Sequence, residues 1–240
     1  MKDIPLFTTA GGLASLTLSQ IPKSGNAWGQ IHQYLPDNLN FMIYDICSFL
    51  LDCGAKRIFI NVENSKIAGA VSAYQTITMK YEQSNEIPLS CSASRIHIIK
   101  ASPITAATWH NIYRRCFSNV LHNRPLTLQE VETRSQTGFL YIAIFNGIPI
   151  GCGEIGGGEL RVAAILPEFQ QKGFGSEFIR QLIEMSEATT LLLETTSENS
   201  AALRLYQSMN FREVHREHWY LFENIYAAEP QNSNMRRMNH

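Results

Sequence analysis

Apolar positions alternate with polar ones, or run together without a break, in several short stretches of the chain, and elsewhere they recur every three to four residues. The first two patterns are typical of strands and the third of helices. In the second half, the pattern predicts strands at 95–100, 139–145, 148–155, 159–166 and 190–195. It predicts helices from Ser102 to about Phe117, from Thr127 to Gln136 and after Gly175. This mixture indicates an α/β fold of the α+β kind, built on a mixed sheet.

The first half of the chain repeats part of this pattern. Strands are expected at 14–21, 27–35 and 57–62, and a helix over 38–53 that ends at Gly54. A further helix is expected at 67–75 and a strand at 76–82. The order strand, strand, helix, strand parallels the centre of the second half. It suggests a degenerate half-copy of the same unit, with an unrelated α/β accessory domain as the alternative.

A polar stretch at 83–86, followed by Pro88, predicts a domain boundary. We therefore expect an N-terminal degenerate or accessory domain over 1–90 and a second domain over 91–226. After a final pair of strands, around Val214 and at 219–222, residues 227–240 form a polar tail with no core-forming pattern.

The amino-acid composition limits the classes of partner that we expect the protein to bind. The 240 residues are 45% apolar and carry 20 basic and 21 acidic side chains, for a net charge of −1. No global field therefore favours nucleic acid or an anionic membrane, and no apolar run approaches the roughly 20 residues of a membrane span. The five cysteines are scattered without C-x-x-C spacing, so neither disulfides nor a metal site are expected. They are Cys47, Cys53, Cys91, Cys116 and Cys152. We expect a cytoplasmic protein without nucleic-acid or membrane partners.

The segment from Ile165 to Phe178 predicts a phosphate site. The strand before it ends at Pro167, and Gly173 and Gly175 are free to adopt positive φ before a helix begins. Such a loop directs several backbone N–H groups and the positive end of a helix dipole at one point. The segment lacks the P-loop pattern, and bulky Phe178 stands at the close-packing position of a dinucleotide fingerprint.

Two motifs resemble those of the GNAT superfamily of N-acyltransferases. Gln170, Gly173 and Gly175 match its motif A, and the stretch 199–211 is similar to its motif B, with Asn210 in place of a glycine. Asn is the next-best residue for a left-handed helix cap, so the departure is minor. The resemblance covers about residues 95–225. It implies a GNAT fold, a site for coenzyme A with acetyl-CoA as the acyl donor, and a catalytic role for the domain expected over 91–226.

The resemblance also implies which residues bind the donor. Asn199 should cap the motif B helix and contact the pantetheine arm. The expected donor-binding residues are Ala164, Ile165, Leu166, Gln170, Gln171, Lys172, Gly173, Phe174, Gly175, Ser176, Asn199 and Tyr206. The first half has no glycine between Tyr34 and Asn38, where the matching loop would lie, so we do not expect it to bind coenzyme A.

Direct acyl transfer to an amine needs three groups. A base must remove a proton, because an amine with a pKa near ~10.4 is almost wholly protonated near pH 7. Glu159 is the first candidate by resemblance to histone-type members of the family, and Glu194 on the adjacent strand is the second. By the same resemblance, backbone N–H groups at 164–166 should stabilise the thioester oxygen, and Tyr206 stands at the family's position for the general acid that protonates the departing thiolate.

The expected reaction is acetyl transfer to a primary amine. Transfer of a longer acyl chain and a catalytically inactive CoA-binding sensor or interaction module remain alternatives. The acceptor is open among amine-bearing small molecules, peptides and proteins, because acceptor loops vary while the motifs do not. A monomer and a homodimer are equally compatible with the sequence.

Overall fold

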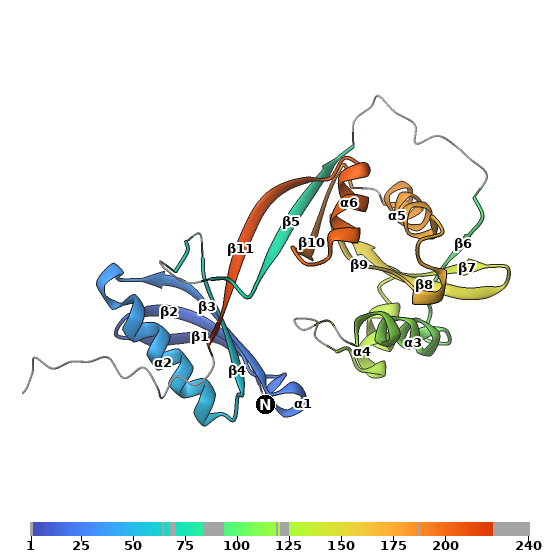
Figure 1. Ribbon diagram of the computed structural model, residues 1–240. Coiled ribbons are helices and arrows are strands. Elements are labelled where there is room, and N and C mark those ends of the chain that lie inside the picture. The colour runs from blue at the N-terminus through green and yellow to red at the C-terminus, as the bar shows by residue number, and fades with distance from the viewer. Residues whose placement is uncertain are drawn as a thin grey trace, which may run out of the picture. The chain divides into compact units, whose positions relative to one another are not determined.

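The computed structural model describes residues 2–63, 65–67, 71–83, 94–118, 120, 125–186 and 188–222. They form two compact units: unit 1 holds the described residues up to Thr76 and from Glu217 onward, and unit 2 holds those from Ile77 to Arg216. The long strands β5 (Tyr74–Glu82) and β11 (Arg212–Phe222) contribute residues to both (Figure 1). The predicted boundary at 90/91 and the polar tail lie outside the described residues, so both stay predictions. No helix in the described ranges is long and apolar enough to cross a membrane.

Unit 1 is a sheet with one long helix. Its strands have the order β1-β2-β3-β4-β11-β5, and α2 connects the parallel pair β3 and β4. The elements are β1 (Ile4–Thr9), β2 (Gly12–Thr17), α1 (Ile21–Ser24), β3 (Asn26–Tyr34), the 3-10 turn η1 (Pro36–Asn38), α2 (Leu39–Asp52) and β4 (Arg57–Val62).

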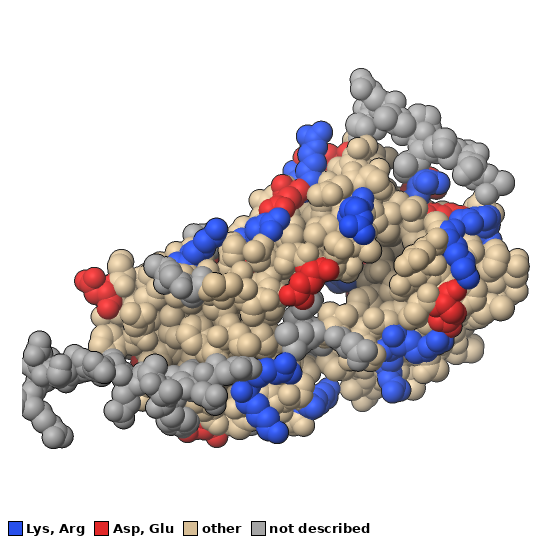
Figure 2. Space-filling model, viewed as in Figure 1, with Lys and Arg blue, Asp and Glu red and all other residues tan. Residues whose placement is uncertain are grey.

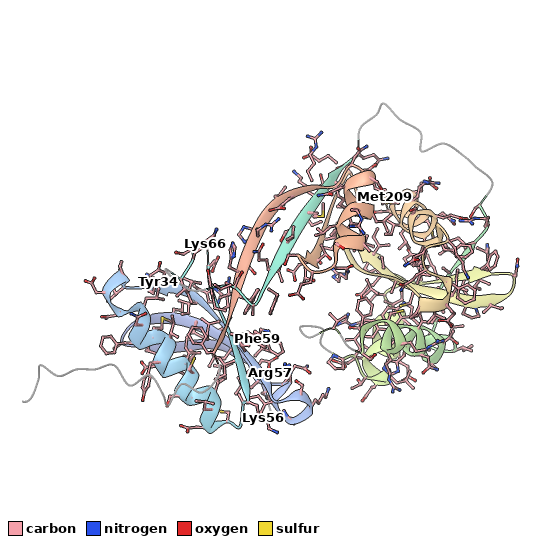
Figure 3. All side chains as sticks on the ribbon, in the orientation of Figure 1. Tyr34, Lys56, Arg57, Phe59, Lys66 and Met209 are labelled. Carbon is pink, nitrogen blue, oxygen red and sulfur yellow. The ribbon has the colours of Figure 1, made fainter. Side chains whose placement is uncertain are left out.

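The two faces of this sheet bury different side chains, because alternate residues of a strand point to opposite faces. On one face, α2 packs Ile46 against the apolar side chains of β3 and β4, and at Gly29 even a Cβ would lie 2.9 Å from Ile46 Cγ2. On the other, Trp28 stacks on Phe59, labelled in Figure 3, with ring centroids 5.5 Å apart. Trp28 Nε1 donates to Tyr74 Oη at 2.8 Å. Unit 1 therefore has an aliphatic face and an aromatic face.

Unit 2 is a sheet with helices on both faces. Its strand order is β11-β5-β10-β9-β8-β7-β6. The elements are β6 (His97–Lys100), α3 (Ala106–Phe117), α4 (Leu128–Ser135), β7 (Leu140–Phe145), β8 (Ile148–Gly156), β9 (Glu159–Ile165), η2 (Pro167–Phe169), α5 (Phe174–Met185), β10 (Thr190–Thr196) and α6 (Ser200–Ser208).

Each face of the unit 2 sheet has its own core. Helices α5 and α6 cover one face, where Phe178 and Leu182 are fully buried, and α3 and α4 cover the other, around Trp109 and Val131 (Figure 1). Trp109 Nε1 donates to the carbonyl of Gly153 in β8 at 3.0 Å, which satisfies a polar group inside an apolar core. The mixed α/β architecture predicted from the sequence is confirmed.

Most predicted elements are present, with ends shifted by a few residues. The Thr127–Glu130 capping box of α4 is confirmed, as is the Asn146-Gly147 turn, where both residues have positive φ. The helix predicted over 67–75 is wrong: the described residues before Tyr74 are irregular, and β5 already begins there. The predicted final strand pair is one continuous strand, β11. Strand β1 was not predicted, and the strand predicted over 14–21 ends at Thr17, before α1.

The two units share an order of elements. In unit 1, β2 and β3 are antiparallel and α2 leads to β4, parallel to β3. In unit 2, β8 and β9 are antiparallel and α5 leads to β10, parallel to β9. This common order fits the half-copy interpretation, but whether the two units share an origin stays a prediction.

One carboxylate fixes the start of α5 to the segment before β6. Glu177 accepts hydrogen bonds from Ser94 Oγ at 2.7 Å, the Ile96 amide at 2.9 Å, Arg95 Nε at 3.1 Å and the Arg95 amide. Burial alone would raise the pKa of Glu177, but these hydrogen bonds outweigh it and lower the pKa below its ordinary value. Ionised Glu177 therefore stabilises this junction.

Glu177→Gln should lower the free energy of unfolding by about 2 kcal/mol near pH 7, because charge-assisted hydrogen bonds are lost. A carboxylate with a lowered pKa contributes stability above its unfolded-state value and loses it as the pH falls through the folded-state value. The difference in melting temperature between the parent protein and the variant should therefore shrink below about pH 4. Glu184→Gln, exposed on the same helix, is the control. A gap that stays constant down to acid pH would contradict this role.

Candidate functional site

The loop between β9 and α5 forms a tight turn at Gly173. Gly173 has φ 83° and is the N-cap of α5, and Gln171 also has positive φ, at 58°. Gly175 differs from the expectation: it lies in the first turn of α5, and a Cβ there would be 3.5 Å from Leu205 Cδ2 of α6. The first glycine is needed for backbone conformation, and the second lies where α5 approaches α6. The N–H groups of the first turn of α5 are those that the sequence predicts to bind an anion.

A cavity of about 430 Å³ lies beside this loop, and we name it the donor cavity. Its wall is formed by the end of β9, the loop, the first turns of α5 and one face of α6. Nine of the residues predicted to bind the donor line it: Ala164, Ile165, Gln170, Gln171, Gly173, Gly175, Ser176, Asn199 and Tyr206. Residues up to 42 positions apart in the sequence thus meet around one space.

Three residues predicted to bind the donor are placed elsewhere. Leu166 is buried in the core formed with α3 and α4. Lys172 donates from Nζ to the carbonyl of Glu168 at 2.8 Å. Phe174 is buried with its ring centroid 4.7 Å from that of Phe145. The side chains of these three residues therefore support the loop rather than face the cavity.

Other lining residues were not predicted. Cys116, Phe117 and Val120 come from the end of α3 and beyond it, and no motif marks them in the sequence. Ala202 and Leu205 also line the cavity, and the motif B spacing could have identified them. Burial is the main influence on the pKa of Cys116 and raises it to about 11, so this thiol stays neutral.

Some backbone groups at the end of β9 are already hydrogen-bonded within the protein. Gln170 Nε2 donates to the carbonyl of Ile165 at 2.8 Å, and the Leu166 amide donates to the carbonyl of Ile150 in β8 at 2.8 Å. The Leu166 amide is therefore already used. Because successive N–H groups of a strand point to opposite sides, the Ile165 amide points away from β8. Of the three amides predicted to stabilise an oxyanion, Ile165 is the one that this geometry favours.

The cavity opens where β9 leaves its parallel neighbour. Strand β9 pairs with β8 up to Ile165. Its pairing with the parallel strand β10 joins Glu159, the first residue of β9, to Leu192, the third residue of β10. The cavity-lining residues Ala163 to Ile165 lie farther along β9.

Asn199 caps α6 as predicted, since its side chain accepts a hydrogen bond from the Ala202 amide at 3.2 Å. The left-handed conformation predicted for Asn210 is also confirmed, with φ 65°.

Tyr206 lies in the wall of the donor cavity with 8% of its surface exposed. Burial raises its pKa to about 12, because a phenolate is poorly stabilised away from water. Tyr206 is therefore a neutral phenol over the whole physiological range and keeps the proton that a general acid needs.

A second hollow, of about 480 Å³, adjoins the first, and we name it the acceptor hollow. Both candidate bases, Glu159 and Glu194, line it, and Phe117 and Val120 line both spaces. A register shift between β8 and β9, where Leu160 pairs with Ile155 and Val162 with Glu154, interrupts the alternation of β9 at Arg161. Leu160 and Ala163 belong to the core beneath α5 and α6, and Val162 to the core beneath α3 and α4, so Glu159 does not share a sheet face with Ala163, which lines the donor cavity. The tertiary structure thus brings the donor loop, the phenol and two carboxylates to adjoining spaces.

Arg161 lies between Glu159, which lines this hollow, and Glu154, which is not among its lining residues. Its guanidinium lies 2.8 Å from Glu159 Oε2 and 3.7 Å from an oxygen of Glu154, which also pairs with Arg134 at 3.0 Å. Glu154 is buried and pairs with both Arg134 and Arg161, whereas the side chain of Glu159 is about half exposed. Glu159 is therefore more accessible to solvent than Glu154.

Over the residues that the structure describes, no three His, Cys, Asp or Glu side chains gather in a group able to hold a metal.

Comparison with known proteins agrees with this geometry. Residues 106–211, from α3 to the end of motif B, match the acetyltransferase (GNAT) family model. A stretch of 56 residues is 32% identical to the N-alpha-acetyltransferase RimI of Mycobacterium tuberculosis. That stretch covers 23% of this chain and only 35% of the relative, so the chain matches about a third of that relative's length.

Solved structures extend the likeness to most of the chain. A GCN5-related N-acetyltransferase from Sphaerobacter thermophilus superposes with a TM-score of 0.68 at 11% identity, covering 88% of this chain and 76% of that one. A conserved protein of unknown function from Staphylococcus epidermidis gives 0.61 at 14% identity, over 93% and 95%. At such identities the likeness is one of fold. The chain thus has a GNAT fold, and its residues 106–211 match the acetyltransferase (GNAT) family model.

Proposed function

We propose that this protein is an acetyl-CoA-dependent N-acetyltransferase that acts on a primary amine. The family uses acetyl-CoA, and the observation that carries the proposal for this chain is the junction of its two spaces. The donor cavity contains the glycine turn and Tyr206, and the acceptor hollow, which shares Phe117 and Val120 with it, contains two carboxylates. A thioester and an amine could meet at that junction.

The residues of the donor cavity suit coenzyme A. Its diphosphate would bind the N–H groups that follow Gly173 at the start of α5. The apolar and small side chains between β9 and α6, including Ala164, Ala202 and Leu205, would contact the pantetheine arm. No side chain of these three competes with the arm for hydrogen bonds.

The proposed transfer is a single displacement. The neutral amine attacks the thioester carbonyl, forming the C–N bond, and the C–S bond breaks as coenzyme A leaves as a thiolate. Glu159 or Glu194 accepts the proton released from the amine, directly or through water, and the Ile165 amide donates to the oxyanion. Tyr206 then gives its proton to the thiolate. The phenol is the weaker acid in water, but the apolar surroundings that raise its pKa also raise the proton affinity of a buried thiolate.

The donor site can be tested with a pair of glycine variants. Gly173→Ala and Gly138→Ala each force a side chain into left-handed backbone, φ 83° and 75°, at a cost of about 1 kcal/mol. Only Gly173 lines the donor cavity. Calorimetric titration with acetyl-CoA should show about tenfold weaker binding for Gly173→Ala and unchanged binding for Gly138→Ala, because only the former displaces the anion-binding amides. Equal affinities in both variants, or no binding by the parent protein, would sink the assignment.

The role of Tyr206 can be tested by thiol release from acetyl-CoA with a panel of small amines, peptides and proteins. With any acceptor that reacts, Tyr206→Phe should lower kcat about a hundredfold and leave the KM for acetyl-CoA nearly unchanged, because only proton donation is lost. Tyr141→Phe, another buried tyrosine of unit 2, is the control and should keep its turnover. A fully active Tyr206→Phe enzyme would require another proton donor.

The base can be identified from the pH dependence of Glu159→Gln and Glu194→Gln. The variant that lacks the base should be about a hundredfold slower near pH 7, and its deficit should shrink as the pH rises, because the amine then loses its proton to solvent. The other variant should be reduced by the same factor at every pH. Glu184→Gln, which lines neither space, is the control. If the turnover of both variants is reduced by the same factor at every pH, neither carboxylate is the base.

A further inference from the structure

Three side chains of unit 1 lie in the order that nucleophilic catalysis requires. Ser15 Oγ is 3.0 Å from Nε2 of His32, and Nδ1 of the same imidazole is 2.7 Å from Oε2 of Glu63. A hydroxyl, an imidazole and a carboxylate in this order activate a serine in many unrelated enzymes, where geometry and not sequence position identifies them. None of the three lies in the GNAT motifs or lines the donor cavity or the acceptor hollow.

The two hydrogen bonds fix the direction in which a proton can move. A carboxylate only accepts, so Nδ1 of His32 carries a proton and donates a hydrogen bond to Glu63. In the neutral imidazole, Nε2 is then left to accept, and the hydroxyl of Ser15 donates to it. The Ser15 hydroxyl therefore directs its proton at a base, as a nucleophilic serine must.

An irregularity of the sheet brings His32 to Ser15. The register of β2 and β3 shifts so that His32 has no partner residue on β2. A bulge of this kind re-aims a side chain and is frequent next to active sites. Glu63 directly follows β4, the neighbour of β3 (Figure 1), and its amide donates to the carbonyl of Ile31 at 2.9 Å. The backbone thus holds Glu63 beside His32.

An exposed apolar side chain adjoins Ser15. A second register shift, between β1 and β2, places two residues of β1 opposite Ser15, and one of them is Leu6. Ser15 and Leu6 share the sheet face opposite α2, because Phe7 and both chain neighbours of Ser15 pack in the core beneath that helix. Leu6 is 64% exposed, and a small alkyl or aryl group of a substrate would cover it.

The three groups are open to a reactant. The side chains of His32 and Glu63 are 34% and 40% exposed, and Ser15 is partly exposed. The charge of the protein favours neither an anionic nor a cationic substrate, since the net charge is −1 and the two signs are interspersed on the face drawn in Figure 2. A small neutral molecule fits these conditions.

The backbone around Ser15 limits which substrates can react. Strand β2 lies between β1 and β3 and pairs with both, so its amides serve the sheet ladders. An N–H group that stabilises the developing oxyanion is worth about a hundredfold or more in rate. With the amides used in the ladders, the expected substrates are esters whose leaving group departs easily, such as phenyl esters.

We propose that Ser15, His32 and Glu63 form a second reaction centre, which hydrolyses small neutral esters with a good leaving group. Ser15 Oγ bonds to the ester carbon, and its proton passes to Nε2 of His32. The bond from that carbon to the alcohol oxygen breaks, and His32 gives the proton to the departing oxygen. Water then attacks the acyl-serine in the same way, which releases the carboxylic acid and restores the hydroxyl. Glu63 is a positioning residue that holds the imidazole in the tautomer described above.

The test is reaction of the whole chain with a fluorophosphonate probe, which labels nucleophilic serines, followed by peptide mapping. The parent protein should be labelled at Ser15, and p-nitrophenyl acetate should leave an acetyl group on the same peptide. His32→Gln should be labelled about a hundredfold more slowly, because the base is lost. Ser48→Ala, which removes a partly exposed serine of α2, is the matched control and should keep the parent rate. Melting temperatures verify that each variant is folded.

Glu63→Gln tests the positioning role separately. It should slow labelling of Ser15 about tenfold, because a neutral carboxamide replaces the charged acceptor of the Nδ1 hydrogen bond. The NMR signal of the Nδ1 proton of His32 should shift in this variant and persist in Ser15→Ala. An unchanged signal in Glu63→Gln would show that Glu63 does not hold the imidazole.

Two outcomes would overturn the inference: a folded parent protein that is not labelled at Ser15, and equal labelling rates in the parent protein and His32→Gln. In the second case the reactivity of Ser15 would not depend on the imidazole. The proposed acetyl transfer uses residues of unit 2, so its failure is distinguishable. Labelling of Ser15 that depends on His32, in a protein that binds no acetyl-CoA, would support this inference while the proposed function failed.

Discussion

The left-handed turn at Gly173 sets the position at which α5 begins, and the candidate site depends on that position. The turn lets the chain leave β9, pass through η2 and enter the helix so that its first N–H groups face the donor cavity. Packing makes the position definite: Phe174 is buried directly after the turn, and Glu177 ties the next turn of the helix to the segment before β6. An anion site made of backbone N–H groups needs such a fixed helix start, because those groups cannot adjust independently as side chains can.

The cavity itself results from an interruption of the sheet. Strand β9 stays paired with β8 to its end, while its pairing with β10 is limited to the start of the two strands. Where they diverge, α6 supplies the facing wall, and Tyr206 enters it as a buried, neutral phenol. Backbone groups that would otherwise complete a sheet ladder are then available for a ligand. The proposed donor site thus depends largely on backbone groups, whereas the proposed acceptor site depends on side chains. This explains why motifs identify a donor and leave the acceptor open.

Unit 1 illustrates the same order of elements without the same turn. Its strand β3 leads through η1, with Pro36 at the start, into α2, and none of those residues is a glycine. The face of its sheet opposite α2 is filled by stacked aromatic rings, including Trp28 and Phe59. Similar topology therefore carries different surfaces, and only the unit with the glycine turn has the geometry expected of a CoA site.

The sequence by itself determined the local features: the mixed α/β class, the hairpin turn at Asn146, the capping residues Thr127 and Asn199, and the loop before α5. These depend on φ preferences and on hydrogen bonds within a few residues, which a short segment encodes. The tertiary structure alone decided which side chains meet. It moved Lys172 and Phe174 away from the cavity, brought Phe117 to it, and made β5 out of a segment interpreted partly as helix. Those outcomes depend on strand register and on contacts between residues far apart in the chain, for which no local pattern exists.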